Sequence, residues 1–145
     1  MSNNRILTGS RGVEDLRAEL LRRGYSVQIM SLNNRGFDAV CRSPKLKDFR
    51  LEVKTSDSRG TQIPIQPHHV DGELQDDLFY VFVKIKPENH IPSGYYFLTH
   101  EELKAAWILM PRRSLRTNQP YSLKTRYLDW CLLRLHRDRW YKLPE

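Results

Sequence analysis

Two acidic residues and a lysine stand at a spacing that suits chemistry on a phosphodiester. Asp38 is followed, after a gap of thirteen residues, by Glu52 and then Lys54. If residues 37 to 41 and 49 to 54 are antiparallel strands joined by a loop centred midway, Asp38 lies opposite Glu52, with Cβ atoms about 5 Å apart. Because side chains alternate along a strand, Glu52 and Lys54 share one face. Two carboxylates and an ammonium group are therefore expected to converge.

Carboxylates held this close repel each other, and a divalent cation removes the conflict. Oxygen ligands with open water positions suit Mg²⁺ or Mn²⁺. Such an ion lowers the pKa of a bound water and neutralises charge on a phosphoryl group, while an adjacent ammonium orients the nucleophile. Zinc is not indicated, because His68 and His69 are neighbours that cannot both point inward from a strand. The pattern thus predicts metal-assisted attack on a phosphodiester.

The elements that must position these residues follow from the apolar pattern. Ser10 is expected to cap an amphipathic helix that runs to about Arg23 and ends at Gly24. The turn residues 33 to 36 separate the first two of the predicted strands, and Pro64 restricts one strand to an edge or a bulge. The predicted strands span residues 25 to 30, 37 to 41, 49 to 54, 61 to 66, 78 to 85 and 95 to 98.

The segments between and after these strands have their own signals. Residues 67 to 77 are expected to form a loop or a single helical turn. Thr99 and Glu102 form a capping box, and the helix that they open should stop before Pro111. A further helix is expected within residues 125 to 140. This order of elements predicts an α/β domain with a mixed central sheet flanked by helices.

The motif Phe37-Asp38, the gap and Glu52-Val53-Lys54, preceded by a helix carrying Glu14, resembles the PD-(D/E)XK nuclease superfamily. This superfamily includes restriction enzymes, archaeal junction resolvases and some homing endonucleases. The resemblance covers residues 10 to 56 and extends more loosely to later strands, with Phe37 in place of the proline of the motif. It implies a restriction endonuclease-like core. It also implies Asp38, Glu52, Glu14 and the carbonyl of Val53 as metal ligands, with Lys54 as the catalytic lysine.

Some of the candidate residues have an explanation other than a role in the site. Glu14 is one of them. An acid in the first turn of a helix stabilises the helix whether or not it binds metal. Similarly, Gln62 can be an ordinary surface residue. The residues expected to contact phosphate or nucleic acid are Thr55, Ser56, Arg59, Gln62, Arg112, Arg113 and Arg116.

Positive charge is concentrated at the C-terminal end. Residues 111 to 145 hold nine Lys or Arg and three acidic residues, so they carry six of the seven net positive charges. Aromatic residues are interleaved with these cations, a combination suited to phosphate contact and base stacking. A basic, solvated surface is the alternative explanation. We expect a basic helical extension from about residue 111.

The length and composition indicate a single domain, residues 1 to 145, with 39% hydrophobic residues. No apolar run approaches the roughly 20 residues of a membrane span, and the two distant cysteines are typical of a cytoplasmic protein. The leading hypothesis is a magnesium-dependent DNA endonuclease, and related enzymes suggest a homodimer. The alternatives are a catalytically inactive nucleic-acid-binding module of the same fold and a structural or partner-binding domain.

Overall fold

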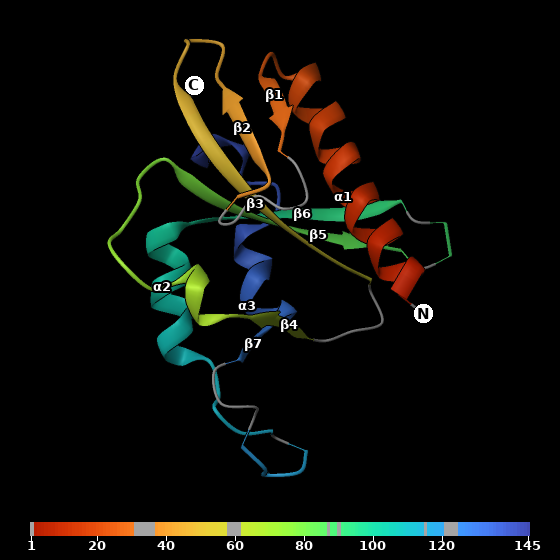
Figure 1. The fold of residues 1–145 in the computed structure, drawn as a ribbon, viewed down its shortest axis with the longest axis vertical. Helices are drawn as coiled ribbons and strands as arrows, with labels where there is room; N and C mark the ends of the chain where they lie inside the picture. The colour runs from red at the N-terminus through yellow and green to blue at the C-terminus, as the bar shows by residue number, and fades with distance from the viewer. Residues whose placement is uncertain are drawn as a thin grey trace.

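The computed structural model describes residues 2–30, 37–57, 62–86, 88–89, 91–114, 116–120 and 125–145, with side chains from residue 11 onward. Its elements, shown in Figure 1, are α1 (Ser2–Arg22), β1 (Ser26–Ile29), β2 (Ala39–Arg42), β3 (Asp48–Asp57), β4 (Gln62–Ile65), the 3-10 turn η1 (Pro67–His69), β5 (Leu78–Ile85), β6 (Pro92–Thr99), α2 (His100–Leu109), β7 (Arg126–Asp129), α3 (Trp130–Leu133) and the 3-10 turns η2 (Arg134–His136) and η3 (Trp140–Lys142).

The central sheet has five strands in the order β1-β2-β3-β5-β6. Strands β3 and β5 are parallel and the other neighbours are antiparallel, so the predicted mixed sheet is confirmed. The β2–β3 register pairs Ala39 with Leu51 and Val40 with Arg50. Continued by one pair, this register sets Asp38 opposite Glu52, as the hairpin model of this segment predicted.

Apolar side chains cover both faces of the sheet. One face packs under α1 through Leu16 and Leu20, together with Leu51 of β3 and Val81 of β5. The opposite face packs under α2, β4, β7 and α3 (Figure 1), and its buried members include Tyr80. The alternation along β3 therefore gives one face to α1 and leaves the other for polar chemistry.

Helix α1 begins at Ser2, so the prediction that Ser10 caps it is wrong. A capping residue favours a helix start but does not prevent the preceding residues from continuing the helix. The predicted end is confirmed, since Gly24 follows the helix with a φ of +90° that glycine adopts without strain. The predicted turn at residues 33 to 36 lies outside the described residues.

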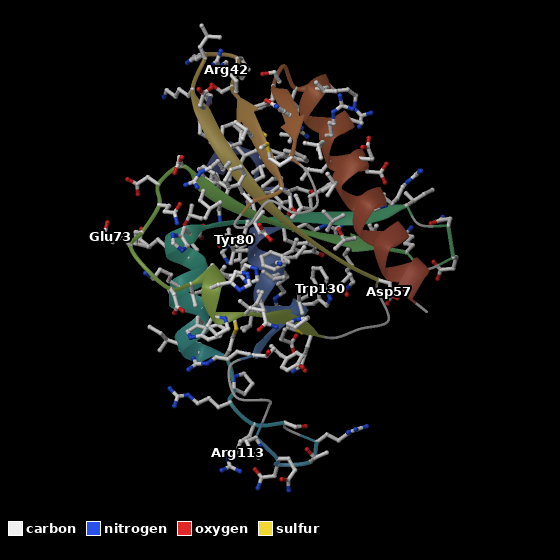
Figure 2. All side chains as sticks on the ribbon, viewed as in Figure 1. Arg42, Asp57, Glu73, Tyr80, Arg113 and Trp130 are labelled. Atoms are coloured by element: carbon white, nitrogen blue, oxygen red, sulfur yellow. The ribbon has the colours of Figure 1, made fainter. Side chains whose placement is uncertain are left out.

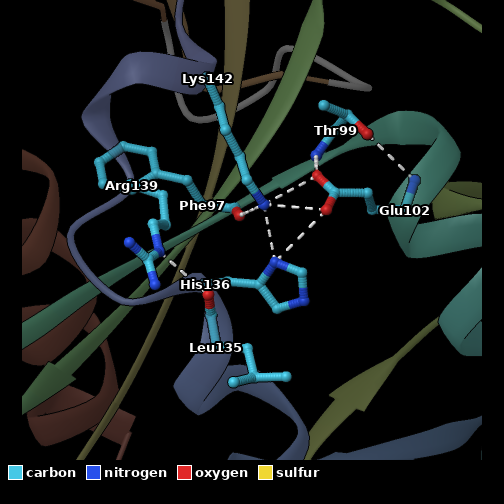
Figure 3. Close-up of polar contacts among 7 residues, drawn as sticks. All are labelled: Phe97, Thr99, Glu102, Leu135, His136, Arg139 and Lys142. Carbon is cyan, nitrogen blue, oxygen red and sulfur yellow. Dashed lines mark hydrogen bonds and ion pairs between the residues drawn. The ribbon is translucent and has the colours of Figure 1, made fainter.

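Helix α2 begins with the predicted capping box. The Glu102 N–H donates to the Thr99 hydroxyl at 3.1 Å, and the Thr99 N–H donates to Glu102 Oε1 at 3.0 Å. Glu102 also accepts hydrogen bonds from the Lys142 ammonium, at 3.0 Å to Oε1 and 2.9 Å to Oε2 (Figure 3). This contact ties the C-terminal segment to the start of α2.

The chain after Pro111 is more than a basic helical extension. Its strand β7 pairs with β4 to form a separate two-stranded sheet, and this is the only pairing of β4 within the described residues. Of the two positions that Pro64 allowed, an edge or a bulge, the structure shows the edge. Leu128 and Leu133 are buried in the core. The predicted helix within residues 125 to 140 is short, because α3 has four residues and is followed by η2. None of the helices described here is long and apolar enough to cross a membrane.

Candidate active site

The face of β3 that points away from α1 carries Glu52 and Lys54. The Lys54 ammonium lies 3.1 Å from Glu52 Oε1. The Glu52 side chain is 12% exposed and that of Lys54 is 26% exposed, so the pair is reached by solvent at its edge. An ion pair in such a half-buried place is stronger than one on the open surface. The β alternation of the sequence is what places both groups on one side.

Asp38 joins this pair from the start of β2. Its backbone N–H donates to the Leu51 carbonyl at 2.7 Å, which continues the β2–β3 ladder. Its Oδ2 accepts the Val53 N–H at 2.6 Å. Asp38 is thereby held against the β3 backbone on both sides of Glu52, by its own N–H at Leu51 and by its carboxylate at Val53. The structure thus brings together Asp38, Glu52 and Lys54, the three residues that the sequence singled out first.

The pKa values of the two carboxyl groups are shifted in opposite directions. Burial and the negative charge of Glu52 raise the pKa of Asp38, and the Val53 N–H only partly opposes this. Burial also acts to raise the pKa of Glu52, but the His69 ring and the Lys54 ammonium outweigh it and hold that pKa below its usual value. Interacting carboxylates with divided proton affinities are a common feature of functional sites.

His69 is a member of this cluster that the sequence reasoning missed. Its Nε2 lies 3.8 Å from Glu52 Oε1, and the residue is 5% exposed. The structure places His68 and His69 in the 3-10 turn η1, which confirms the loop or single helical turn predicted for residues 67 to 77. Neighbouring side chains in such a turn point in different directions. Pro67, which begins this turn, is the sequence signal that favours a turn over a strand.

A cavity of about 230 Å³ lies beside His69 on the same face of the sheet. Its lining includes Arg50, which is next but one to Glu52 along β3, and the aromatic rings of Phe37 and Tyr80. The Arg50 guanidinium is held by Asp77 at 2.8 Å. The candidate site therefore continues into a hollow with aromatic walls and a fixed cation.

Glu14 does not lie beside Asp38 and Glu52. Its side chain is 64% exposed on α1 and lies 3.9 Å from Arg17. Thr55 points to the opposite face of β3, where it packs so closely on Gly12 that a Cβ at position 12 would lie 2.1 Å from Thr55 Oγ1. The Ser56 hydroxyl donates to the Asp57 carbonyl at 3.4 Å. The predicted roles of these residues stay predictions.

The remaining predicted contacts lie further along the chain. Gln62 is half-buried in β4, opposite Asp129 of β7. Arg59 lies outside the described residues. Arg112, Arg113 and Arg116 belong to the segment between α2 and β7, which extends away from the rest of the molecule in Figure 1, and Figure 2 shows Arg113 there.

The two carboxylates of the site fit a divalent cation. Two coupled carboxylates, each with burial opposing its charge, fit a hard cation that would remove their repulsion. The Val53 carbonyl is the backbone oxygen between Glu52 and Lys54. Across the described part of the chain no group of three His, Cys, Asp or Glu is arranged to hold a metal ion. A bound ion would therefore keep several of its coordination positions for water or substrate.

Comparison with solved structures finds this arrangement of elements in Archaeoglobus fulgidus Hjc, a Holliday junction resolvase from an archaeal hyperthermophile. The likeness covers 88% of each chain at 15% sequence identity, with a TM-score of 0.51. No family model matches the sequence. No curated protein matches it either.

The fold is therefore that of the restriction endonuclease-like proteins, with a mixed central sheet flanked by helices. The fold that the sequence resemblance implied is thereby confirmed. Fold alone does not assign an activity, which has to be argued from the site.

Proposed function

We propose that this protein is a metal-dependent nuclease that hydrolyses phosphodiester bonds in DNA. The observation that carries the proposal is the convergence of Asp38, Glu52 and Lys54 on one face of the sheet, at the positions that the superfamily motif uses. The structural likeness to a junction resolvase supports branched DNA as the first substrate to test.

The proposed roles follow from the contacts. Asp38, Glu52 and the carbonyl of Val53 would hold Mg²⁺ or Mn²⁺. When bound, such an ion supplies an activated water and neutralises charge that builds up on the phosphoryl group. The Val53 N–H holds the Asp38 carboxylate in a fixed orientation. Lys54 keeps an ammonium group at the edge of the pair, where it can orient the attacking water and stabilise developing negative charge.

The segment of residues 111 to 120 is proposed to contact the DNA backbone. Among its described residues, the Ser114 N–H donates to the Gln119 carbonyl at 2.9 Å, and the Arg113 guanidinium donates to the Asn118 carbonyl at 3.2 Å. Burial and the positive charge of Arg112 both lower the pKa of Arg126 on β7. Cations that repel each other at the base of a basic projection favour an anionic partner such as a phosphate.

Two further features belong to the proposal. A homodimer would place two such sites on one branched or duplex substrate, which is how a single-domain nuclease cuts two strands. Residues Thr55, Ser56, Arg59 and Gln62 remain proposed contacts for the nucleic acid. The basic residues of the projection are assigned to positioning and not to base recognition.

A catalytically inactive DNA-binding module of the same fold is the second candidate, and one observation favours it. Glu14 lies exposed on α1, so the described residues offer two carboxylates at the site in place of three. The two candidates differ in cleavage alone. Supercoiled plasmid and a four-way junction are each incubated with Mg²⁺, Mn²⁺ or EDTA. The nuclease cuts one of them with metal and neither with EDTA, whereas the module binds both and cuts neither.

A further inference from the structure

The imidazole of His69 is held in one orientation inside the protein. The Gln66 N–H donates to His69 Nδ1 at 3.1 Å, so in the neutral ring Nδ1 is the acceptor and Nε2 carries the hydrogen. The backbone of the same residue is fixed as well. Its carbonyl accepts the Tyr80 hydroxyl at 2.8 Å and is also bonded by His100. The ring orientation is therefore set by Gln66, and the backbone position by Tyr80 of β5 and His100 of α2.

This Nε2 is buried, and it has no hydrogen-bond partner among the described residues. It faces Glu52 Oε1 at 3.8 Å, a distance at which charges interact but which is too long for a hydrogen bond. A buried donor without a partner is unfavourable, so proteins seldom keep one without a use. The group that Nε2 can reach with a small movement is the Glu52 carboxylate.

Glu52 needs such a donor if it is a metal ligand. At present its Oε1 is neutralised by Lys54 at 3.1 Å. Under the proposed function the same ammonium orients the nucleophile, so it cannot remain fully engaged with Glu52. Carboxylates that bind metals are in turn hydrogen-bonded by outer groups, and loss of such a group typically weakens metal binding by about 10- to 100-fold.

We propose that His69 is a positioning residue, which donates a hydrogen bond from Nε2 to Glu52 and thereby sets the metal affinity of the site. The inference rests on the proposed function, because it assigns Glu52 to the metal. What it adds is that a residue of η1 supplies the hydrogen bond to the Glu52 carboxylate. Tyr80 and His100, which hold the His69 carbonyl, then support the site from β5 and α2 without touching the metal.

Two substitutions separate this role from a purely structural one. His69→Gln places an amide N–H near the position of Nε2 but gives up the acceptor for Gln66. His69→Asn keeps an acceptor near the position of Nδ1 but has no donor that reaches Glu52. Mn²⁺ binding to the full chain, without DNA, is measured by the electron paramagnetic resonance signal of free Mn²⁺. His68→Ala, on the exposed neighbour, is the matched control.

We expect His69→Asn to bind Mn²⁺ about 10- to 100-fold more weakly. His69→Gln retains most of the affinity, and His68→Ala equals the wild type. The reverse order of the two His69 variants would show that the histidine only caps η1, and equal affinities in all variants would overturn the proposal as well. If neither His69 variant folds, Tyr80→Phe decides: weaker Mn²⁺ binding supports the proposal and unchanged binding overturns it.

The proposed function can fail separately. If the wild type binds Mn²⁺ and Glu52→Gln removes the binding while His69→Asn does not, only the role of His69 is lost. If the wild type shows no Mn²⁺ binding that depends on Glu52, the metal site itself is absent and both proposals fall.

Discussion

Replacing Lys142 should destabilise the fold without touching the candidate site. Its side chain is 13% exposed, and its ammonium contacts both Glu102 oxygens, the Phe97 carbonyl at 3.1 Å and His136 Nδ1 at 2.7 Å (Figure 3). Lys142→Met keeps an unbranched chain up to the position of Cε and removes the ammonium group. The Glu102 carboxylate, which is one-third exposed, would then lose its cation at the start of α2.

The magnitude lies between two limits. Breaking a fully buried ion pair costs about 3 to 5 kcal/mol, and an exposed pair contributes about 0 to 1 kcal/mol. For this partly exposed pair we expect a loss of about 2 kcal/mol, which corresponds to a fall of about 4 to 8 °C in Tm for a chain of this size. The control is Lys45→Met, because Lys45 pairs with Glu145 at 3.5 Å and both side chains are more than two-thirds exposed.

The same pair predicts a pH dependence. Burial acts to raise the pKa of Glu102, but the Thr99 N–H and Lys142 outweigh it, so the pKa in the folded protein is below the ordinary value of 4.5. A carboxyl group of this kind stabilises the fold above its ordinary pKa, and the stabilisation is lost as the pH falls through the folded pKa. The difference in Tm between wild type and Lys142→Met, measured by calorimetry, should therefore shrink as the pH falls below 4.5. Equal effects of Lys142→Met and Lys45→Met would refute the reasoning.

Two other predictions follow from packing and charge. Replacing Arg112, Arg113 and Arg116 by alanine should weaken DNA binding for all sequences alike and reduce the slope of log K against log salt by up to about three, as fluorescence anisotropy would show; an unchanged slope would assign these residues to the solvated surface. Gly12→Ala should destabilise the protein by about 1 to 3 kcal/mol through overpacking on Thr55, and Thr55→Ala should restore part of it in denaturant unfolding. A stabilising Gly12→Ala would mean that α1 can move off β3.

Local patterns predicted most of what places the site. Period-two alternation from Phe49 to Lys54 defined the strand and its two faces, and the turn midway between Asp38 and Glu52 defined the register. The Thr99 capping box is equally local, since both of its bonds join residues three apart. Such features depend on contacts between near neighbours, which the sequence displays directly.

Features that depend on long-range packing were missed. The pairing of β4 with β7 joins segments more than sixty residues apart, and no pattern within either segment indicates its partner. His69 is close to Glu52 only because η1 folds back onto β5 through the Tyr80 hydroxyl. The exposed position of Glu14 is a matter of the rotation of α1 about its axis, which the burial of Gly12, Leu16 and Leu20 decides.

The central claim is that Asp38, Glu52 and Lys54 form a metal-dependent site that cuts DNA. It is tested most directly by cleavage of a four-way junction and of supercoiled plasmid by the wild type, Glu52→Gln and Lys54→Ala, each titrated with Mn²⁺. Glu52→Gln keeps the size of the side chain but weakens the ligand set, whereas Lys54→Ala removes the ammonium beside the attacking water.

We predict that the wild type cuts with metal and not with EDTA, and that both variants fold and bind DNA but cut orders of magnitude more slowly. High Mn²⁺ should restore part of the activity of Glu52→Gln and none of that of Lys54→Ala. Equal cleavage by all three proteins would place the activity outside this site. A wild type that binds DNA and cuts neither substrate in Mg²⁺ or Mn²⁺ would contradict the claim.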